Sequence, residues 1–218
     1  MSLSGGKFAN LRPGEFRSIP GKTKENYFTY ADKDPNVEHV REGVHDDGSC
    51  FFHALACIRN ENNYHTESHS NRQRIGHNLR RKLQSMITPQ TWLPFWKAKG
   101  VPIDKVPTCK EIRRKMKDTN EWATVYMIRF CMDRLGQNLY FFDATNNKLY
   151  CGVENLQDTN PTGLVCWLNH AHFEPIVEIN RHTGKVLKNF GHDHVLINNI
   201  LRQYQKDGCA RVDLKDVV

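Results

Sequence analysis

The chain has 218 residues, of which 39% are hydrophobic and 25% are charged, with a net charge of +7. This length suits one domain with a hydrophobic core, and this composition excludes a disordered chain. No apolar run approaches the roughly 20 residues that cross a bilayer, and residues 1–7 lack the apolar segment of a secretory signal. We therefore expect a cytoplasmic protein without membrane contact, acting in its own cell or in the cytosol of a host.

The positive charge is concentrated in one part of the chain. Residues 72–117 contain thirteen Lys or Arg against Asp104 and Glu111, a net charge of +11. Such a stretch is either a solvated helical surface or a docking face for an acidic partner. Its aromatic residues, Trp92, Phe95 and Trp96, form one cluster and do not alternate with the charges, and the stretch has no Gly-rich RNA-binding signature, so nucleic acid is the weaker interpretation.

The cysteine and histidine spacings do not predict a metal. The seven cysteines contain no C-x-x-C pair, so a disulfide framework or a zinc ribbon is not indicated, and most of these thiols should be small core residues. The H-x-H pairs His170/His172 and His192/His194 have no partners at ligand spacing. We predict no metal and no cofactor.

Turn signals mark the first part of the chain. Pro13-Gly14, Pro20-Gly21 and Asp34-Pro35 predict an irregular N-terminal arm over residues 1–40. The predicted domain body covers residues 41–204. Residues 205–218 would then form a C-terminal tail.

Helical patterns follow. The apolar run from Cys50 to Arg59 predicts a first helix, and Ile75, Leu79 and Leu83 recur at the spacing of a second, with Arg80 to Lys82 on its outside. Prolines predict a loop over residues 89–107.

Two more helices follow the proline-rich loop. Thr108 and Glu111 form a capping-box pattern that starts a short basic helix ending near Lys117. A further helix should run from Glu121 to Leu135 and stop at Gly136.

The second half of the chain changes to strand patterns. Strands are predicted at residues 138–142, 164–168, 173–179 and 185–187, followed by a helix at 195–204. Helices first and strands later predict an α+β fold, layered α/β/α, with a small central sheet flanked by helices.

Cys50 is the candidate nucleophile. It follows Asp47-Gly48-Ser49 and opens a helix, where the helix dipole and free backbone N–H groups favour a thiolate. Gly48 would let the preceding loop turn sharply and gather those N–H groups as an oxyanion hole. The alternative is that Cys50 is a small buried residue and residues 47–49 are only a helix cap.

His172 is the candidate base. It starts a strand, and Glu174 lies two residues on, hence on the same strand face. A carboxylate there can hold the imidazole in the tautomer that accepts a proton from a thiol. His170 shares that face by strand alternation, so periodicity does not separate the two histidines.

These segments resemble the signatures of one family. Residues 47–55, Asp-Gly-Ser-Cys-Phe-Phe-His-Ala-Leu, closely resemble the cysteine block of ovarian-tumour (OTU) deubiquitinases, and residues 168–176 are similar to its histidine block. Residues 120–123 and the strand at 138–142 are similar to its middle motif. The resemblance covers residues 44–179 in the family's order. The histidine block is similar to that of viral and bacterial-effector members.

The resemblance implies a papain-like OTU cysteine protease fold and assigns roles. Cys50 would be the nucleophile and His172 the general base, since Phe173 follows it as in the family. Asp47, Gly48, Ser49 and the Cys50 amide would belong to the oxyanion loop. The family has Asp or Asn two residues after the histidine, where this chain has Glu174, so the third member is Glu174, Asp46 or Asp47.

The resemblance implies a thiol protease that removes ubiquitin or a ubiquitin-like modifier, with those modifiers and their conjugates as partners. Two alternatives stay open: an OTU-fold peptidase that acts on a polyprotein, and a non-enzymatic basic module that binds nucleic acid or an acidic partner.

Overall fold

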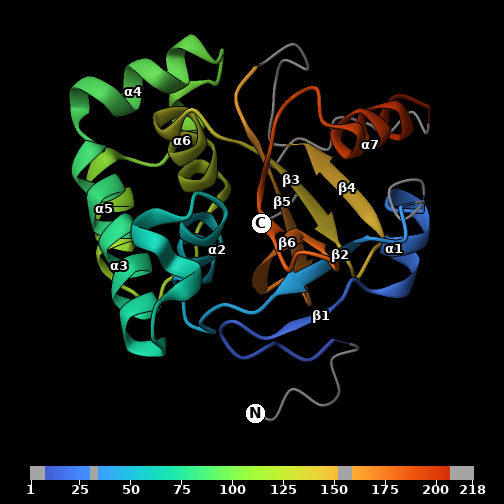
Figure 1. Cartoon of the computed structure of the whole chain (residues 1–218). Helices are drawn as coiled ribbons and strands as arrows, with labels where there is room; N and C mark the ends of the chain where they lie inside the picture. Colours follow the sequence, from blue (N-terminus) through green and yellow to red (C-terminus); the bar gives the residue numbers. More distant parts are fainter. Residues whose placement is uncertain (1–7, 30–33, 152–158, 207–218) are drawn as a thin grey trace.

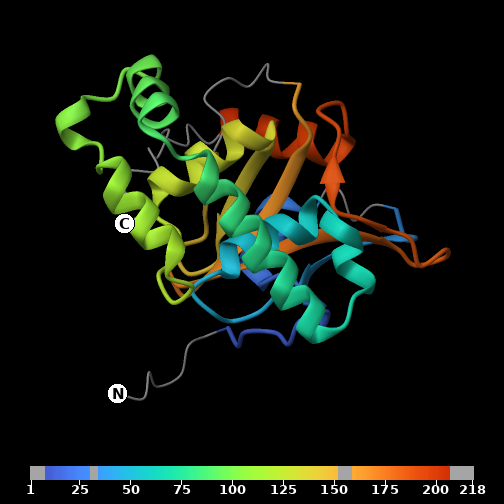
Figure 2. The same cartoon turned by 90° about the vertical axis from the view of Figure 1, so that its left-hand side faces the viewer.

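The structure, a computed structural model, describes residues 8–29, 34–151 and 159–206. A mixed β-sheet stands between two groups of helices (Figure 1). The helices are α1 (Gly21–Tyr27), α2 (Cys50–Ile58), α3 (His69–Met86), α4 (Pro89–Ala98), α5 (Cys109–Lys117), α6 (Val125–Leu135) and α7 (Val195–Lys206), with short 3-10 turns at Glu61–Thr66 and Ile103–Lys105. Helices α2 to α6 lie on one side of the sheet, and α1 and α7 lie on the other (Figures 1 and 2).

Within the described residues the sheet contains eight strands. They are β1 (Phe16–Ser18), β2 (Val37–Glu42), β3 (Asn138–Asp143), β4 (Lys148–Cys151), β5 (Thr162–Leu168), β6 (His172–Asn180), β7 (Val186–Leu187) and β8 (Asn189–Phe190). The order is β1-β2-β6-β5-β3-β4, with β7 on β6 and β8 on β5. Strands β3 and β5 are parallel, and the other pairs are antiparallel.

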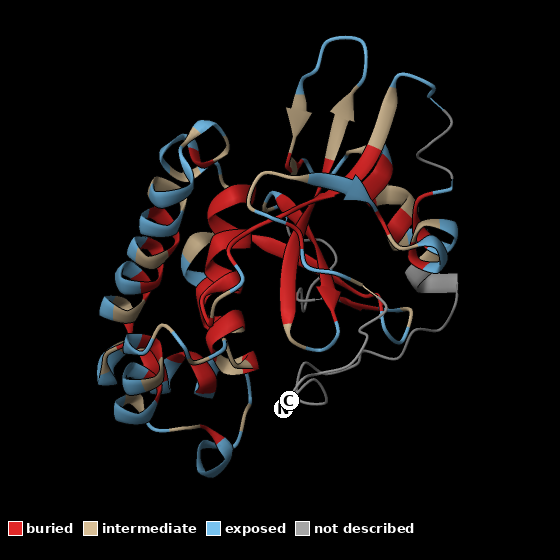
Figure 3. Cartoon of the chain, turned by 90° about the horizontal axis from the view of Figure 1, so that it is seen from below, coloured by how far each residue is buried: buried red, intermediate tan, exposed pale blue. Residues whose placement is uncertain are grey.

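Side-chain alternation along β3 separates two cores. Leu139 and Phe141 pack with α2 and its neighbouring helices, whereas Tyr140 and Phe142 pack with α1 and α7. The strand is therefore buried on both faces, and the buried residues run through the middle of the molecule (Figure 3). This arrangement confirms the predicted α/β/α layering.

The irregular arm predicted for residues 1–40 differs from the structure. Residues 16–18 pair with β2, residues 21–27 are helical, and β2 lies between β1 and β6 in the sheet. The sequence of β2 is polar although the strand is partly buried. Its polar side chains have partners inside the fold: His39 contacts Glu178, and Arg41 contacts Glu174. Hydrophobic periodicity does not detect a strand of this kind.

Two other predicted boundaries were wrong. The proline-rich segment expected as a loop forms α4, because Pro89 occupies the first helical position and Thr88 and Thr91 form a capping box. Helix α6 begins at Val125 instead of Glu121, since the Thr124 side chain caps it by accepting from the N–H of Met127.

The remaining predicted helices α2, α3, α5 and α7, and the predicted strands in β3, β5, β6 and β7, are confirmed within one to six residues. The predicted tail at residues 205–218 lies almost wholly outside the described residues. No helix in the described ranges combines the length and apolar character that a membrane crossing requires.

Candidate active site

Cys50 is the first residue of α2, as predicted. Its side chain is almost fully covered, and its thiol donates to the carbonyl of Ala171 at 3.8 Å. Burial raises the pKa of the Cys57, Cys131 and Cys166 thiols well above the ordinary range, so these three are inert core residues.

His172 begins β6 and lies opposite Leu168 on β5. Its Nε2 lies 3.5 Å from Oε1 of Glu174, and its Nδ1 lies 3.3 Å from Oδ1 of Asp46. Burial lowers the pKa of His172, but hydrogen-bonding interactions with Cys50 and Glu174 outweigh it and raise the pKa to about 9. The structure thus brings Cys50, His172 and Glu174 together.

Glu174 is fully buried and firmly held. Its Oε2 accepts a hydrogen bond from Nη1 of Arg41 at 2.7 Å, and its Oε1 accepts from the N–H of Leu11 at 2.8 Å. An ionised carboxylate survives burial only with such partners. Glu174 therefore presents a fixed negative charge to the Nε2 side of the His172 ring.

Asp46 lies at the opposite nitrogen of His172 and is 63% exposed. Because Nε2 faces Glu174, Nδ1 is the nitrogen left to accept the proton of a thiol. Asp46 competes for that nitrogen rather than orienting the ring. Its other oxygen, Oδ2, accepts a hydrogen bond from Nδ2 of Asn10 at 2.8 Å.

The sequence also suggested Asp47 as the acid that orients His172, but its carboxylate contacts other residues. Its Oδ1 accepts from the N–H of Ser49 at 2.8 Å and lies 3.4 Å from Nε2 of His53, and its Oδ2 lies 3.1 Å from Nε2 of His77. Burial raises the pKa of Asp47, but the neighbouring imidazole of His53, the N–H of Ser49 and the imidazole of His77 lower it well below its usual value. Asp47 shapes the loop before Cys50.

Two N–H groups of the predicted oxyanion loop, residues 47–50, are held within the loop. The N–H of Ser49 is held by the Asp47 carboxylate, and the N–H of Cys50 donates to the Asp47 carbonyl at 3.0 Å. Within the described part of the chain, the N–H of Gly48 has no hydrogen-bond partner. Gly48 therefore offers a free donor next to Cys50.

Glycine is required at position 48 for a reason other than the sharp turn that we expected. A Cβ atom there would lie 2.5 Å from the carbonyl oxygens of both Thr119 and Asn120. Glycine lets the cysteine loop pack directly on the backbone of the segment that precedes α6.

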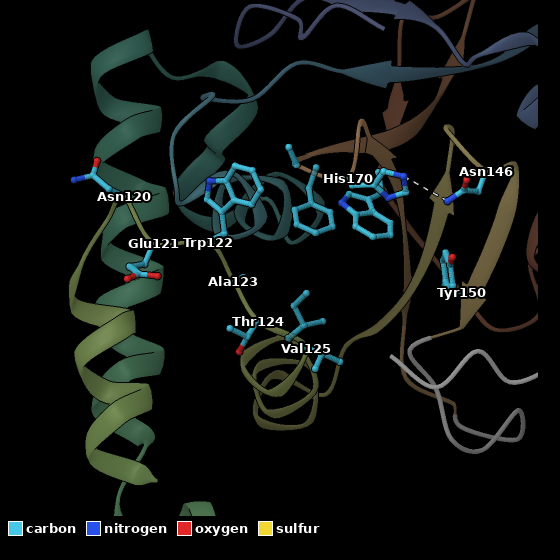
Figure 4. A pocket seen from close by; sticks show the side chains of 13 residues that line it. Asn120, Glu121, Trp122, Ala123, Thr124, Val125, Asn146, Tyr150 and His170 are labelled. Carbon is cyan, nitrogen blue, oxygen red and sulfur yellow. Dashed lines mark hydrogen bonds between the residues drawn. The ribbon is translucent and has the colours of Figure 1, made fainter. Parts of the chain in front are cut away.

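An apolar cavity of about 740 Å³ lies beside Ala171, whose carbonyl accepts the Cys50 thiol. Its lining comes from the segment before α6, the start of α6 and the β4, β5 and β6 region (Figure 4). Aromatic walls come from Trp122, Tyr150, Trp167 and Phe173. Residues 120–123, expected to open a helix, instead form the loop at one edge.

His170 lies in this cavity wall and not in a strand. Its backbone is left-handed, with a φ of 57°, and its Nε2 contacts Nδ2 of Asn146 at 3.4 Å (Figure 4). Strand alternation does not apply to the turn that contains it, so the expectation that both histidines share a face was wrong. His172 alone carries the Glu174 contact.

Arg80 is a functional residue that the sequence placed wrongly, on the outside of its helix. It is fully buried, and its five N–H donors face six acceptors at 2.5–2.9 Å. Two of the acceptors are the Gly48 carbonyl and the Ser49 hydroxyl, and four are the carbonyls of residues 115, 116, 118 and 121. The guanidinium also lies 5.0 Å from the centre of the Phe52 ring. Arg80 therefore ties the cysteine loop to the segment that becomes the cavity wall.

No family model matches this sequence, and no curated protein matches it. Among solved structures, an ovarian-tumour (OTU) domain in complex with ubiquitin is similar over 91% of this chain and 98% of its own, with 17% identity and a TM-score of 0.54. The chain has the OTU fold. This finding confirms the fold that the sequence resemblance implied.

Two more distant OTU structures are also similar. An OTU deubiquitinase from Wolbachia pipientis wMel has 14% identity and a TM-score of 0.43, covering 79% of this chain and 96% of its own. The viral OTU domain protease from Qalyub virus has 14% identity and a TM-score of 0.43, covering 66% and 94%.

We expect Arg80→Lys to lower the free energy of unfolding by more than about 3 kcal/mol, because a lysine leaves several buried carbonyls without a donor. The matched control is Arg81→Lys on the exposed face of α3, which should change it by less than about 0.5 kcal/mol. Urea denaturation measures both. Equal stability of the two variants would show that Arg80 does not hold the loops.

The raised pKa of His172 predicts that its contribution to the free energy of unfolding depends on pH. Because the folded-state value of about 9 exceeds the unfolded value of about 6.5, this contribution is fully present below pH 6.5 and is lost as the pH rises through 9. The stability difference between the wild type and His172→Gln should therefore shrink between pH 6.5 and 9.5 in urea denaturation. His170→Gln, the control, should show no such trend, and a constant difference for His172→Gln would contradict the assignment.

Proposed function

We propose that the protein is a thiol hydrolase that cleaves the isopeptide or peptide bond after the C-terminal glycine of ubiquitin or a ubiquitin-like modifier. The observation that carries this proposal is the convergence of Cys50, His172 and the buried charge of Glu174 beside an apolar cavity. The OTU fold supports it, as does the presence of ubiquitin in the solved OTU complex.

The residues suit each step of acyl transfer. The raised pKa of His172 favours the imidazolium, whose Nδ1 proton is the one released by the Cys50 thiol, and the thiolate attacks the substrate carbonyl carbon. The imidazolium then protonates the leaving amine, which yields a thioester on Cys50. His172 next takes a proton from water, whose oxygen attacks the thioester and releases the carboxylate product with the thiol restored.

The Gly48 N–H is the first donor available to the oxyanion. A second donor requires the Cys50 N–H to exchange its bond to the Asp47 carbonyl for one to the substrate oxygen. Glu174 stays ionised and stabilises the imidazolium, because Arg41 and the Leu11 N–H satisfy its remaining acceptor capacity.

The first test is the reaction of the full chain with a ubiquitin whose C-terminal glycine carries an electrophile. We expect one adduct by intact mass, located on Cys50 by peptide mapping, and none with Cys50→Ala. The control thiol is Cys109, which is partly exposed, and Cys109→Ala should react at the wild-type rate. An adduct on another cysteine would refute the nucleophile, and no adduct together with no cleavage of a ubiquitin C-terminal amide would refute the substrate class.

The second test separates the candidate acids. Glu174→Gln removes the charge on the Nε2 side of His172 and should lower kcat/KM for a ubiquitin C-terminal amide by about ten- to a hundredfold. Asp46→Asn should change it by less than about threefold, because Asp46 competes with the thiol for Nδ1.

The matched control is Glu178→Gln, which removes a carboxylate on the same face of β6 that pairs with His39 instead. It should retain activity. Unfolding midpoints of all three variants separate loss of fold from loss of rate. If Glu174→Gln were fully active while Asp46→Asn folded but lost activity, the acid that orients His172 would be Asp46 in the cysteine loop.

A further inference from the structure

Three side chains outside the Cys50–His172–Glu174 group converge beneath the cysteine loop. They are Asp47 in the loop, His53 on α2 and His77 on α3. Nε2 of His53 lies 3.4 Å from Oδ1 of Asp47, and Nε2 of His77 lies 3.1 Å from Oδ2. One ligand atom from each residue lies within 4.8 Å of the other two.

His53 is the unexplained member of this group. The residue is completely buried, and its Nε2 has no hydrogen-bond partner, although a buried polar atom normally has one. The ring is fixed in place: Nδ1 lies 3.5 Å from the hydroxyl of Tyr64, and the ring fills the space that a Cβ at Gly76 would occupy. Its free nitrogen is therefore held facing Asp47 and His77.

We propose that Asp47, His53 and His77 form a binding site for a divalent transition metal, with zinc the best match. In a tetrahedral zinc site with Zn–N and Zn–O bonds of about 2.0–2.1 Å, neighbouring ligand atoms lie about 3.3 Å apart. Each histidine Nε2 lies close to this spacing from a carboxylate oxygen of Asp47: His53 at 3.4 Å from Oδ1 and His77 at 3.1 Å from Oδ2. Two imidazoles favour zinc over magnesium or calcium.

Two of the three proposed ligands reach the surface. Asp47 and His77 have side chains that are 24% and 27% exposed, which provides an entry path and a position for water. Tyr64 is placed as the outer partner of His53. The neighbouring His45 is not a ligand, because its Nε2 binds the carbonyl of His69 at 2.9 Å.

A metal in this site would join three separate elements through the loop that precedes Cys50. It would fix Asp47, whose Oδ1 holds the N–H of Ser49, to the first two turns of α2 and to the middle of α3. We therefore expect the metal to stiffen the oxyanion loop. Its binding does not depend on the proposed hydrolase activity.

The test uses the full chain with Cys50→Ala, which removes the reactive thiol, after the protein has been stripped with a chelator. Isothermal titration with Zn²⁺ should show one saturable site, and Co²⁺ should give the visible absorption bands of a tetrahedral centre. Zinc should raise the unfolding midpoint of this protein.

When His77→Gln is combined with Cys50→Ala, zinc affinity should fall by about a hundredfold or more. Loss of a residue that only hydrogen-bonds a metal ligand already lowers metal affinity by about ten- to a hundredfold. His77 is partly exposed, so this variant should fold, which circular dichroism checks. The matched control, His182→Gln in the exposed β6–β7 turn, should bind zinc as the parent does. Absence of saturable binding, or equal binding with and without His77, would overturn the proposal.

Discussion

The arrangement of the candidate active site depends on one buried guanidinium. The loop before Cys50 is irregular, and residues 115 to 121 comprise the end of α5 and the loop after it, so many carbonyls in both segments have no partner within a helix or sheet. Arg80 supplies those partners from a planar group with five donors, and it bridges the two segments at the point where Gly48 allows them to touch. Cys50 and the cavity wall are therefore positioned by the same side chain.

Buried charged side chains of the sheet position the histidine part of the site. Strand β2 carries His39, Arg41 and Glu42 into the interior, where each meets a partner from a distant part of the chain. The pair of Arg41 and Glu174 keeps an ionised carboxylate next to His172. Against the lowering effect of burial, Cys50 and then this charge raise the pKa of His172, so a strand without hydrophobic periodicity contributes to the properties of the histidine.

Asp47 connects the site to the helices beneath it. Its carboxylate receives the Ser49 N–H and faces two imidazoles, one of which is buried with an unsatisfied nitrogen. The negative charge that organises the cysteine loop is thus the same charge that would hold a metal. His53 lies one turn after Cys50 on α2, and Asp47 lies three residues before Cys50. A metal bound at this site would therefore restrain the loop directly.

The sequence by itself determined the features that depend on local patterns. The helix start at Cys50, the strand that begins at His172 and the buried strands β3 and β5 follow from residue order and hydrophobic period, which neighbouring residues decide. Only the tertiary structure decided the rest: the burial of Arg80, the strand β2, the choice of Glu174 over Asp46 as the partner of Nε2, and the meeting of Asp47, His53 and His77. The physical reason is that a polar side chain looks like a surface residue in sequence unless its distant partners are known, and those partners are brought to it only by the fold.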